Sequence, residues 1–247
     1  MDRHEPSRAY LSSPGNQMHA SFLTDMPVLV SFALYPKSGR GSKGPWIDDY
    51  VPSFRRLLID SGAYSEMNSG VVVDGVAYKE WQSRWDGVQH VDAIAGLDDI
   101  SGDWRRSMRN YEMYGGFPTC HDTDPPELLD DLIPMAGGRG GWIGVGLKPP
   151  RTGKWDFVRE TLDRIPPDLH VHFWAGGEYS GHPDVDSWDS TNWLLDAFAY
   201  KKALSFLTPA ECVDLVVKRY QRTGKTVATS RSDTRMSITA DLFAGCD

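Results

Sequence analysis

Residues 57–64 read Leu-Leu-Ile-Asp-Ser-Gly-Ala-Tyr, an apolar run that passes directly into a polar, glycine-containing turn. Short runs rich in Val, Ile, Leu and Phe are typical of buried strands, and a polar turn after such a run marks the strand end. The same pattern recurs along the chain, and each time a segment with helical spacing follows it. Alternating strands and helices of this kind predict a parallel sheet covered by helices.

Seven strands are predicted from these runs, and an eighth is not identified: 28–33, 57–59, 91–95, 117–120, 142–145, 170–174 and a short strand ending near Trp188. Helices are expected over 78–85, 103–114, 126–135, 154–165 and 191–203. A last helix opens with Thr208-Pro209-Ala210-Glu211, a capping box with proline at the first helical position, and is expected to end near Arg222. The predicted fold is α/β, a TIM-like barrel of seven or eight parallel strands, with an incomplete barrel left open as an alternative.

The composition fits a single domain. With 247 residues and 40% hydrophobic side chains, the chain is long enough for one barrel. We expect a loop-like segment over 1–26, the barrel over 27–225 and a tail over 226–247. The sequence has no run of eighteen apolar residues and no apolar leader, so we expect a cytoplasmic protein without a membrane partner. The three cysteines are too far apart in sequence to predict a zinc site or a disulfide framework.

The charge pattern bears on nucleic-acid binding. A net charge of -8 argues against broad non-specific binding, but local basic clusters would still contact phosphates. Such clusters are also typical of a solvated helix face and a flexible loop. The candidate phosphate-contacting residues are Lys37, Arg40 and Lys43 in a glycine-rich loop, and Lys218, Arg219, Arg222, Lys225, Arg231 and Arg235 near the end of the chain.

Polar or glycine-rich clusters follow six of the predicted strands, at 60–62, 96–99, 121–122, 144–146, 174–177 and 189–191. In a parallel barrel all of these lie on the C-terminal rim, where active sites assemble. An aspartate after a strand is also a common helix cap, an alternative that applies most to Asp189 because Ser190 and Thr191 follow it. Two carboxylates on one rim can divide the work of glycosidic cleavage, one as nucleophile and one as proton donor and acceptor.

The motif Asp60-Ser61-Gly62-Ala63-Tyr64 resembles the Asp-Ser-Gly-Gly-Phe motif of the tRNA-guanine transglycosylases. The ordered rim motifs, over residues 27–203, resemble most closely their DNA-acting relatives, the 7-deazaguanine DNA transglycosylases of phages and genomic islands. This resemblance implies a bacterial or phage-encoded enzyme that exchanges a base in DNA through a covalent glycosyl-enzyme. It implies no cofactor, and it implies DNA and a free 7-deazaguanine such as preQ0 as substrates.

The resemblance also implies a role for individual residues. Asp189, in Ser187-Trp188-Asp189-Ser190-Thr191, corresponds to the nucleophile that attacks C1′, and Asp60 to the acid/base carboxylate. Asp98 corresponds to the aspartate that reads the amide-like edge of the purine, with Asp99 as the adjacent candidate. The other implied substrate-binding residues are Ser61 of the motif, Tyr64 and Trp174 on either side of the base, His121 at a position where the family often has glutamine, and Gly144 and Gly146 beside the base. For Tyr64 and Trp174, ordinary barrel packing is the alternative.

Two departures from the family pattern limit what the resemblance implies. The zinc cluster of three cysteines and a histidine that the tRNA enzymes carry is absent from this sequence, so we expect no zinc subdomain, no metal and no action on tRNA. The family glutamate after the glycine strand is replaced by Leu147 or Lys148. The alternative is therefore a DNA glycosylase of the same fold that excises a modified base and leaves an abasic site. A retaining glycoside hydrolase and a non-catalytic nucleic-acid-binding protein remain as interpretations from other classes.

Overall fold

A computed structural model describes residues 8–12, 21–24, 26–34, 51–69, 72–138, 140–149, 153–176, 179, 182–190 and 207–223. Within them, eight parallel strands form one sheet in the order β4-β3-β2-β1-β8-β7-β6-β5. The strands are β1 (Arg8–Ser12), β2 (Pro27–Ser31), β3 (Arg56–Asp60), β4 (Val91–Ile94), β5 (Thr119–His121), β6 (Trp142–Gly146), β7 (His170–Phe173) and β8 (Ser187–Ser190).

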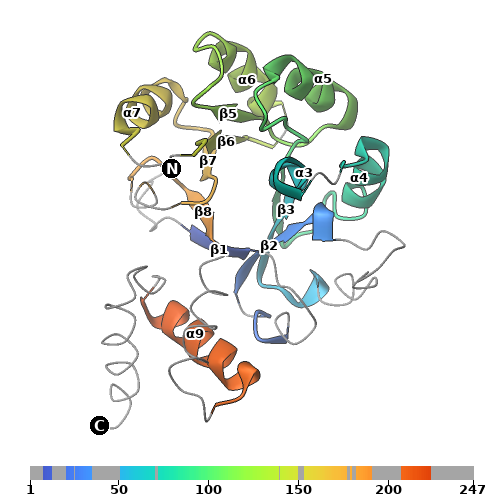
Figure 1. The fold of residues 1–247 in the computed structure, drawn as a ribbon, viewed down its shortest axis with the longest axis vertical. Coiled ribbons are helices and arrows are strands. Elements are labelled where there is room, and N and C mark those ends of the chain that lie inside the picture. Colours follow the sequence, from blue (N-terminus) through green and yellow to red (C-terminus); the bar gives the residue numbers. More distant parts are fainter. Residues whose placement is uncertain are drawn as a thin grey trace.

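The two end strands of this order, β4 and β5, meet through a parallel bridge between Ala95 and Phe117. The N–H of Phe117 donates to the carbonyl of Ile94 at 2.8 Å, and the N–H of Gly96 donates to the carbonyl of Phe117 at 2.8 Å. The sheet therefore curls round on itself, and Figure 1 shows the strands as a ring with helices outside it. This is the TIM-like (β/α) barrel that the sequence predicts.

Helices follow individual strands; α3 (Ala63–Ser69) lies over the rim beside β3, and the other helices lie outside the ring (Figure 1). These others are α4 (Gly75–Gln82) after α3, α5 (Trp104–Tyr114) after β4, α6 (Leu128–Gly137) after β5, α7 (Trp155–Arg164) after β6 and α9 (Pro209–Thr223) after β8. Between β2 and β3 the described residues form only two short 3-10 turns, η1 (Phe32–Leu34) and η2 (Val51–Ser53). Among the described helices, none is long and apolar enough to cross a membrane.

The seven predicted strands are present, with bounds shifted by at most two residues. The predicted capping box is confirmed, since the N–H of Glu211 donates to Thr208 Oγ1 at 3.2 Å and the N–H of Thr208 donates to Glu211 Oε2 at 2.6 Å. Helix α3 was not predicted, and the helix expected over 191–203 lies outside the described residues, as does the tail over 226–247.

The expectation of a loop-like segment over 1–26 is wrong for residues 8–12, which form β1. β1 pairs with β2 on one side and with β8 on the other. Its sequence, Arg-Ala-Tyr-Leu-Ser, is a short alternation with polar ends, so it lacks the apolar run by which the other strands were recognised. The barrel therefore begins before residue 27.

Strand alternation divides the side chains into an inner and an outer set. Tyr10, Leu29 and Leu58 belong to a cluster that fills the barrel interior together with Phe117 and Trp142. Their neighbours along the strands face outward, where they pack against the helices, and α9 contributes Cys212, Val213, Val216 and Val217 to this outer core. The polar residues of the C-terminal rim lie directly above this interior cluster.

Candidate active site

A cavity of about 260 Å³ opens among the C-terminal ends of the strands. Residues from distant parts of the chain line it together, because successive βα-loops of a barrel meet at this rim. The residues predicted from sequence that line it are Asp60, Tyr64, Asp98, His121, Gly146, Trp174 and Asp189.

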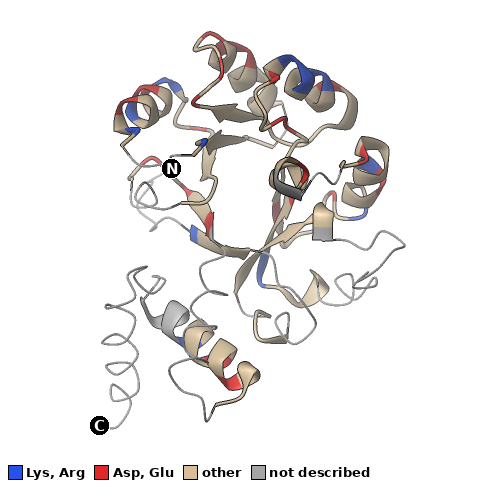
Figure 2. Cartoon of the chain, viewed as in Figure 1, with Lys and Arg blue, Asp and Glu red and all other residues tan. Residues whose placement is uncertain are grey.

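The register of the strands places the two principal carboxylates on the inner face of the barrel. In the sheet, Asp60 lies beside Ser31 of β2, and Asp189 lies beside Tyr10 of β1, whose side chain is buried in the interior. A shift of one residue would turn both carboxylates to the outer face, because side chains alternate along a strand. Figure 2 shows the acidic segments at β3 and β8 on opposite sides of the ring.

Asp60 lies in an environment that favours its protonated form. Burial raises the pKa of the Asp60 carboxyl to about 6, and the negative charges of Asp98 and Asp189 act in the same direction. The neighbouring side chain of Ser31 and the backbone of Gly62 lower the pKa of Asp60 but do not cancel this effect. Asp60 therefore exchanges a proton near neutral pH, as a general acid and base must.

Asp189 is held by the loop that follows β7. Its Oδ1 accepts the N–H of Ala175 at 2.6 Å. Ala175 has a left-handed backbone, φ 61°, which is unusual for a residue with a Cβ. Strained backbone of this kind persists where surrounding contacts fix it, and here it turns the chain so that an N–H meets the carboxylate.

His121 lies between two carboxylates. Its Nε2 is 3.1 Å from Asp98 Oδ2 and its Nδ1 is 3.6 Å from Asp124 Oδ2, which also accepts the His121 N–H at 2.8 Å. Burial by itself lowers the pKa of His121, but hydrogen bonds to Asp124 and Asp98 outweigh it and raise the pKa to about 9. At neutral pH His121 is therefore a buried cation that holds Asp98 in place at the cavity wall.

Two aromatic side chains line the cavity in different ways. Trp174 is fixed, since its Nε1–H donates to Thr119 Oγ1 at 3.0 Å and its ring stacks on Phe117 with centroids 6.0 Å apart. Tyr64, from α3, is 51% exposed at the mouth. A fixed ring inside and an exposed ring at the entrance suit stacking with a flat aromatic group that enters from outside.

The glycines of β6 make room for these side chains. A Cβ on Gly144 would lie 2.5 Å from both Thr119 Oγ1 and Trp174 Nε1, and a Cβ on Gly146 would lie 2.7 Å from Cδ2 of His121. Gly146 lines the cavity, whereas Gly144 is covered by Thr119 and Trp174. Gly144 therefore acts through the placement of Trp174 and not as a wall of the cavity.

Asp99 does not line the cavity with Asp98. Its Oδ1 accepts the N–H of Ser101 at 2.7 Å, and its Oδ2 pairs with Arg106 of α5 at 3.0 Å. Arg106 also pairs with Glu66 of α3 at 2.7 Å, so Asp99 helps to anchor the helix that carries Tyr64. Adjacent residues of this loop point in different directions, and the salt bridge to α5 turns Asp99 away.

Ser61 is also absent from the cavity wall. It is buried directly after β3, and its Oγ accepts the N–H of Ala63 at 3.4 Å at the start of α3. The structure thus gives Ser61 a place at the turn between strand and helix.

The predicted phosphate-contacting residues fall largely outside the described part of the chain. Lys218 lies on α9, where it forms an exposed ion pair with Asp214 at 2.7 Å. Arg219 and Arg222 are in the same helix, but their side chains are not described. The others, Lys37, Arg40, Lys43, Lys225, Arg231 and Arg235, are outside the described residues.

Several cavity residues were not predicted from sequence. Ser12 of β1 and Ser31 of β2 lie on the same wall as Asp60 and Asp189, and Met67 and Ile100 add apolar surface. Asp124 does not line the cavity but binds His121, three residues before it in sequence. Leu147 lines the cavity as well, whereas the backbone N–H of its neighbour Lys148 donates to Asp122.

Comparison with protein-family models, with curated proteins and with solved structures found no match to this chain. The candidate site therefore rests on its own geometry. Within the described ranges, no group of three or more His, Cys, Asp or Glu side chains is arranged to hold a metal ion.

Proposed function

We propose that this protein is a DNA transglycosylase, which cleaves an N-glycosidic bond through a covalent glycosyl-Asp189 and then attaches a 7-deazaguanine to the same sugar. The observation that carries the proposal is the shared cavity of Asp60 and Asp189. One carboxylate has a pKa of about 6, suited to proton transfer, and the other is held by a backbone N–H with one oxygen left for attack. Two carboxylates that are held differently can take different roles on one bond.

In the first half of the reaction, an oxygen of Asp189 attacks C1′ of the sugar as the bond from C1′ to the base nitrogen breaks. The electron pair of that bond leaves with the base, and protonated Asp60 gives its proton to the departing base. The product is a sugar ester of Asp189. A covalent ester of this kind divides one difficult displacement into two easier ones.

In the second half, the Asp60 carboxylate takes a proton from the ring nitrogen of the incoming base, which attacks C1′. The ester bond breaks, and its electron pair returns to the Asp189 carboxylate. Two displacements at one carbon retain its configuration. Asp98 would accept hydrogen bonds from the edge of the base, in the orientation that the contact with His121 fixes.

DNA as the substrate is supported by the resemblance of the rim motifs, and the size of the cavity limits what could enter to a single nucleotide. About 260 Å³ is near the lower limit, roughly 300 Å³, of small-molecule sites, and is too small for a duplex. A nucleotide would have to leave the base stack to enter. Stacking on Trp174 and Tyr64 would then offset part of the lost stacking in DNA.

A second candidate is excision, in which water replaces the incoming base and the product is an abasic site. The side chain of Leu147 favours this candidate, because an apolar group lines the cavity where the transglycosylases carry a glutamate that senses the incoming base. Both candidates use the same first half-reaction, so they differ only in what resolves the ester.

Mass spectrometry of nucleosides from treated DNA separates the two. DNA is incubated with the protein, with and without preQ0, and is then digested and probed for the deazaguanine nucleoside and for abasic sites. Exchange predicts the deazaguanine nucleoside only when preQ0 is present; excision predicts abasic sites in both samples.

Asp189→Asn should give no product, because an amide oxygen is a poor nucleophile. Asp156→Asn, on the exposed surface of α7, is the matched control and should act as the wild type. A fully active Asp189→Asn protein would end both candidates.

A further inference from the structure

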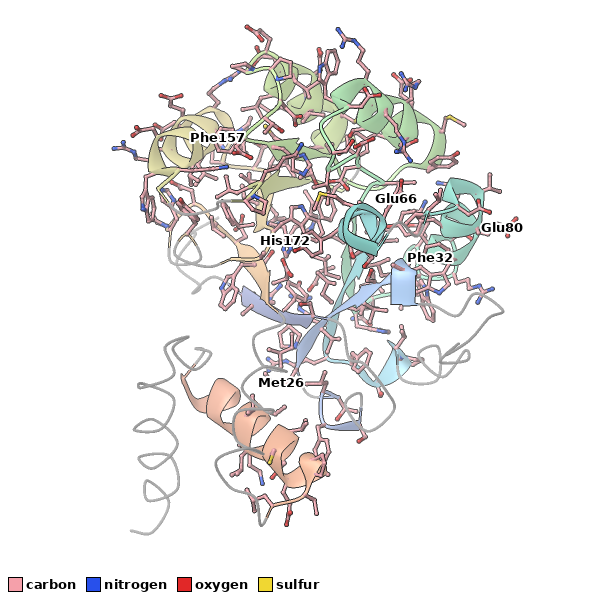
Figure 3. The ribbon with its side chains drawn as sticks, viewed as in Figure 1. Met26, Phe32, Glu66, Glu80, Phe157 and His172 are labelled. Carbon is pink, nitrogen blue, oxygen red and sulfur yellow. The ribbon has the colours of Figure 1, made fainter. Side chains whose placement is uncertain are left out.

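His172 is a buried histidine below the candidate nucleophile. It lies inside the ring of strands, on β7, and none of its surface is exposed (Figure 3). Its Nδ1 is 2.9 Å from the Oγ of Ser187, its partner in the register of β7 and β8. Its Nε2 is 3.6 Å from Asp189 Oδ1 and has no hydrogen-bond partner among the described residues.

Aromatic side chains fix the orientation of the imidazole. The ring of Trp174 meets it edge-on at 4.5 Å and 78°, Tyr10 at 6.0 Å and 70°, and Phe117 at 6.4 Å and 62°. With Nδ1 bound to Ser187 and three rings around it, the imidazole cannot turn freely. Nε2 is therefore kept aimed at the Asp189 carboxylate.

The chemistry of the two neighbours decides where the ring proton lies. A carboxylate can only accept hydrogen bonds, whereas a serine hydroxyl can donate as well as accept. The arrangement is satisfied when Nε2 carries the proton toward Asp189 and Nδ1 accepts the hydroxyl proton of Ser187. If Nε2 carried no proton, its lone pair would face a lone pair of the Asp189 carboxylate oxygen, and the two would repel each other.

We infer that His172 is a positioning residue for Asp189: its Nε2–H and the N–H of Ala175 together hold Oδ1, so that Oδ2 is the oxygen presented to the sugar carbon. The inference rests on the proposed function, in which Asp189 is the nucleophile. The separation of 3.6 Å is slightly longer than a hydrogen bond. Hydrogen bonds in active sites are often long in the free enzyme and shorten when substrate binds.

The position of the ring proton can be measured on the free protein, without DNA. Long-range ¹H–¹⁵N correlation spectra distinguish a protonated from an unprotonated ring nitrogen, and His172→Gln identifies the signal by its loss. We expect Nε2 of His172 to carry a proton. A bare Nε2 would overturn the inference, whatever the protein does to DNA.

Two variants of different length test the consequence for catalysis. The amide of His172→Gln reaches the position of Nε2, whereas the shorter amide of His172→Asn reaches only the position of Nδ1 and Ser187. We expect His172→Asn to lower kcat on the order of 10²-fold with KM unchanged, the size of effect that a misplaced reacting group produces. His172→Gln should retain kcat within several-fold of the wild type.

Thermal melts of both variants show whether they fold. Three outcomes would overturn the inference: an equal loss of kcat in the two variants, no loss in either, or a larger loss in His172→Gln. Each of them would mean that kcat does not depend on the contact between Nε2 and Asp189. If neither variant folds, the ring-proton measurement on the wild type decides. The failure of the proposed function can be distinguished from the failure of this inference. If the wild type is as inactive on DNA as Asp189→Asn, the proposed function fails, but the spectrum of the free protein still reports whether Nε2 carries the proton.

Discussion

Asp60 and Asp189 face one cavity, but their surroundings differ. Burial and the charges of two neighbouring aspartates raise the pKa of Asp60 to about 6, while Asp189 accepts a short hydrogen bond from Ala175. The difference follows from position. Asp60 ends β3 with its carboxyl buried at the cavity wall, and Asp189 accepts a hydrogen bond from the loop that follows β7.

This difference predicts a pH dependence for release of the base. In the proposed reaction, Asp60 must be protonated to give a proton to the departing base, and above its pKa of about 6 the protonated fraction falls. We expect kcat/KM for base release to fall about tenfold per pH unit as the pH rises above this value. The measurement is single-turnover release of base from DNA between pH 5 and pH 9.

Asp60→Asn is the control for that profile, since it should be slow and lack this dependence. A wild-type rate that rises with pH through 6 would contradict the role of Asp60 as the acid.

At the scale of single elements, β6 illustrates how a strand shapes the site without contributing a side chain. Gly144 leaves the space that Trp174 and Thr119 fill, and the hydrogen bond between those two fixes the indole ring. Gly144→Ala should break this hydrogen bond, reduce the free energy of unfolding by about 1–3 kcal/mol and lower kcat/KM through the displaced Trp174.

Urea unfolding and steady-state kinetics check this prediction. Gly137→Ala, at the end of α6 where no atom would lie within 4 Å of the new Cβ, is the matched control and should be neutral or slightly stabilising. Equal stability and activity of Gly144→Ala and the wild type would contradict the account.

The elements that sequence predicts well are those whose signal is local. An apolar run that ends in Asp60-Ser61-Gly62 identifies β3, and alternation along the strand then places Asp60 on the inner face. β1 has no such run, and its burial depends on pairing with β8, almost the whole barrel away in sequence.

The difference between local signals and long-range contacts also applies to neighbouring residues of the site. Asp98 and Asp99 are equivalent in sequence, but Arg106 and Ser101 bind Asp99 while His121 binds Asp98. His172 shows the same limit, because its role depends on the contact between β7 and β8 and not on any motif. Contacts of this kind form only when the barrel closes, so a local pattern does not contain them.

At the scale of the whole molecule, the candidate site reduces stability. The folded state raises the pKa of Asp60 from 3.8 to about 6, so it binds the proton more tightly than the unfolded chain does. The stability from this proton is fully present below pH 3.8 and is lost as the pH rises through about 6. Above that pH, the ionised Asp60 destabilises the barrel.

The free energy of unfolding of Asp60→Asn minus that of the wild type should therefore be larger at pH 8 than at pH 4, by on the order of 1–3 kcal/mol. Urea unfolding at the two pH values measures the change. Asp156→Asn, whose side chain is 85% exposed on α7, should show no such difference. A stability difference between Asp60→Asn and the wild type that is the same at both pH values, or that favours the wild type more at pH 8 than at pH 4, would contradict a raised pKa for Asp60.

The most direct test of the account is the covalent intermediate. Protein mixed with DNA is quenched in acid and digested with nuclease and protease, and the peptide that contains Asp189 is examined by mass spectrometry. We predict a deoxyribose-containing adduct on Asp189 in the wild type and none in Asp189→Asn. An adduct on Asp60, or an active enzyme from which no adduct can be trapped, would contradict the assignment of Asp189 as the nucleophile.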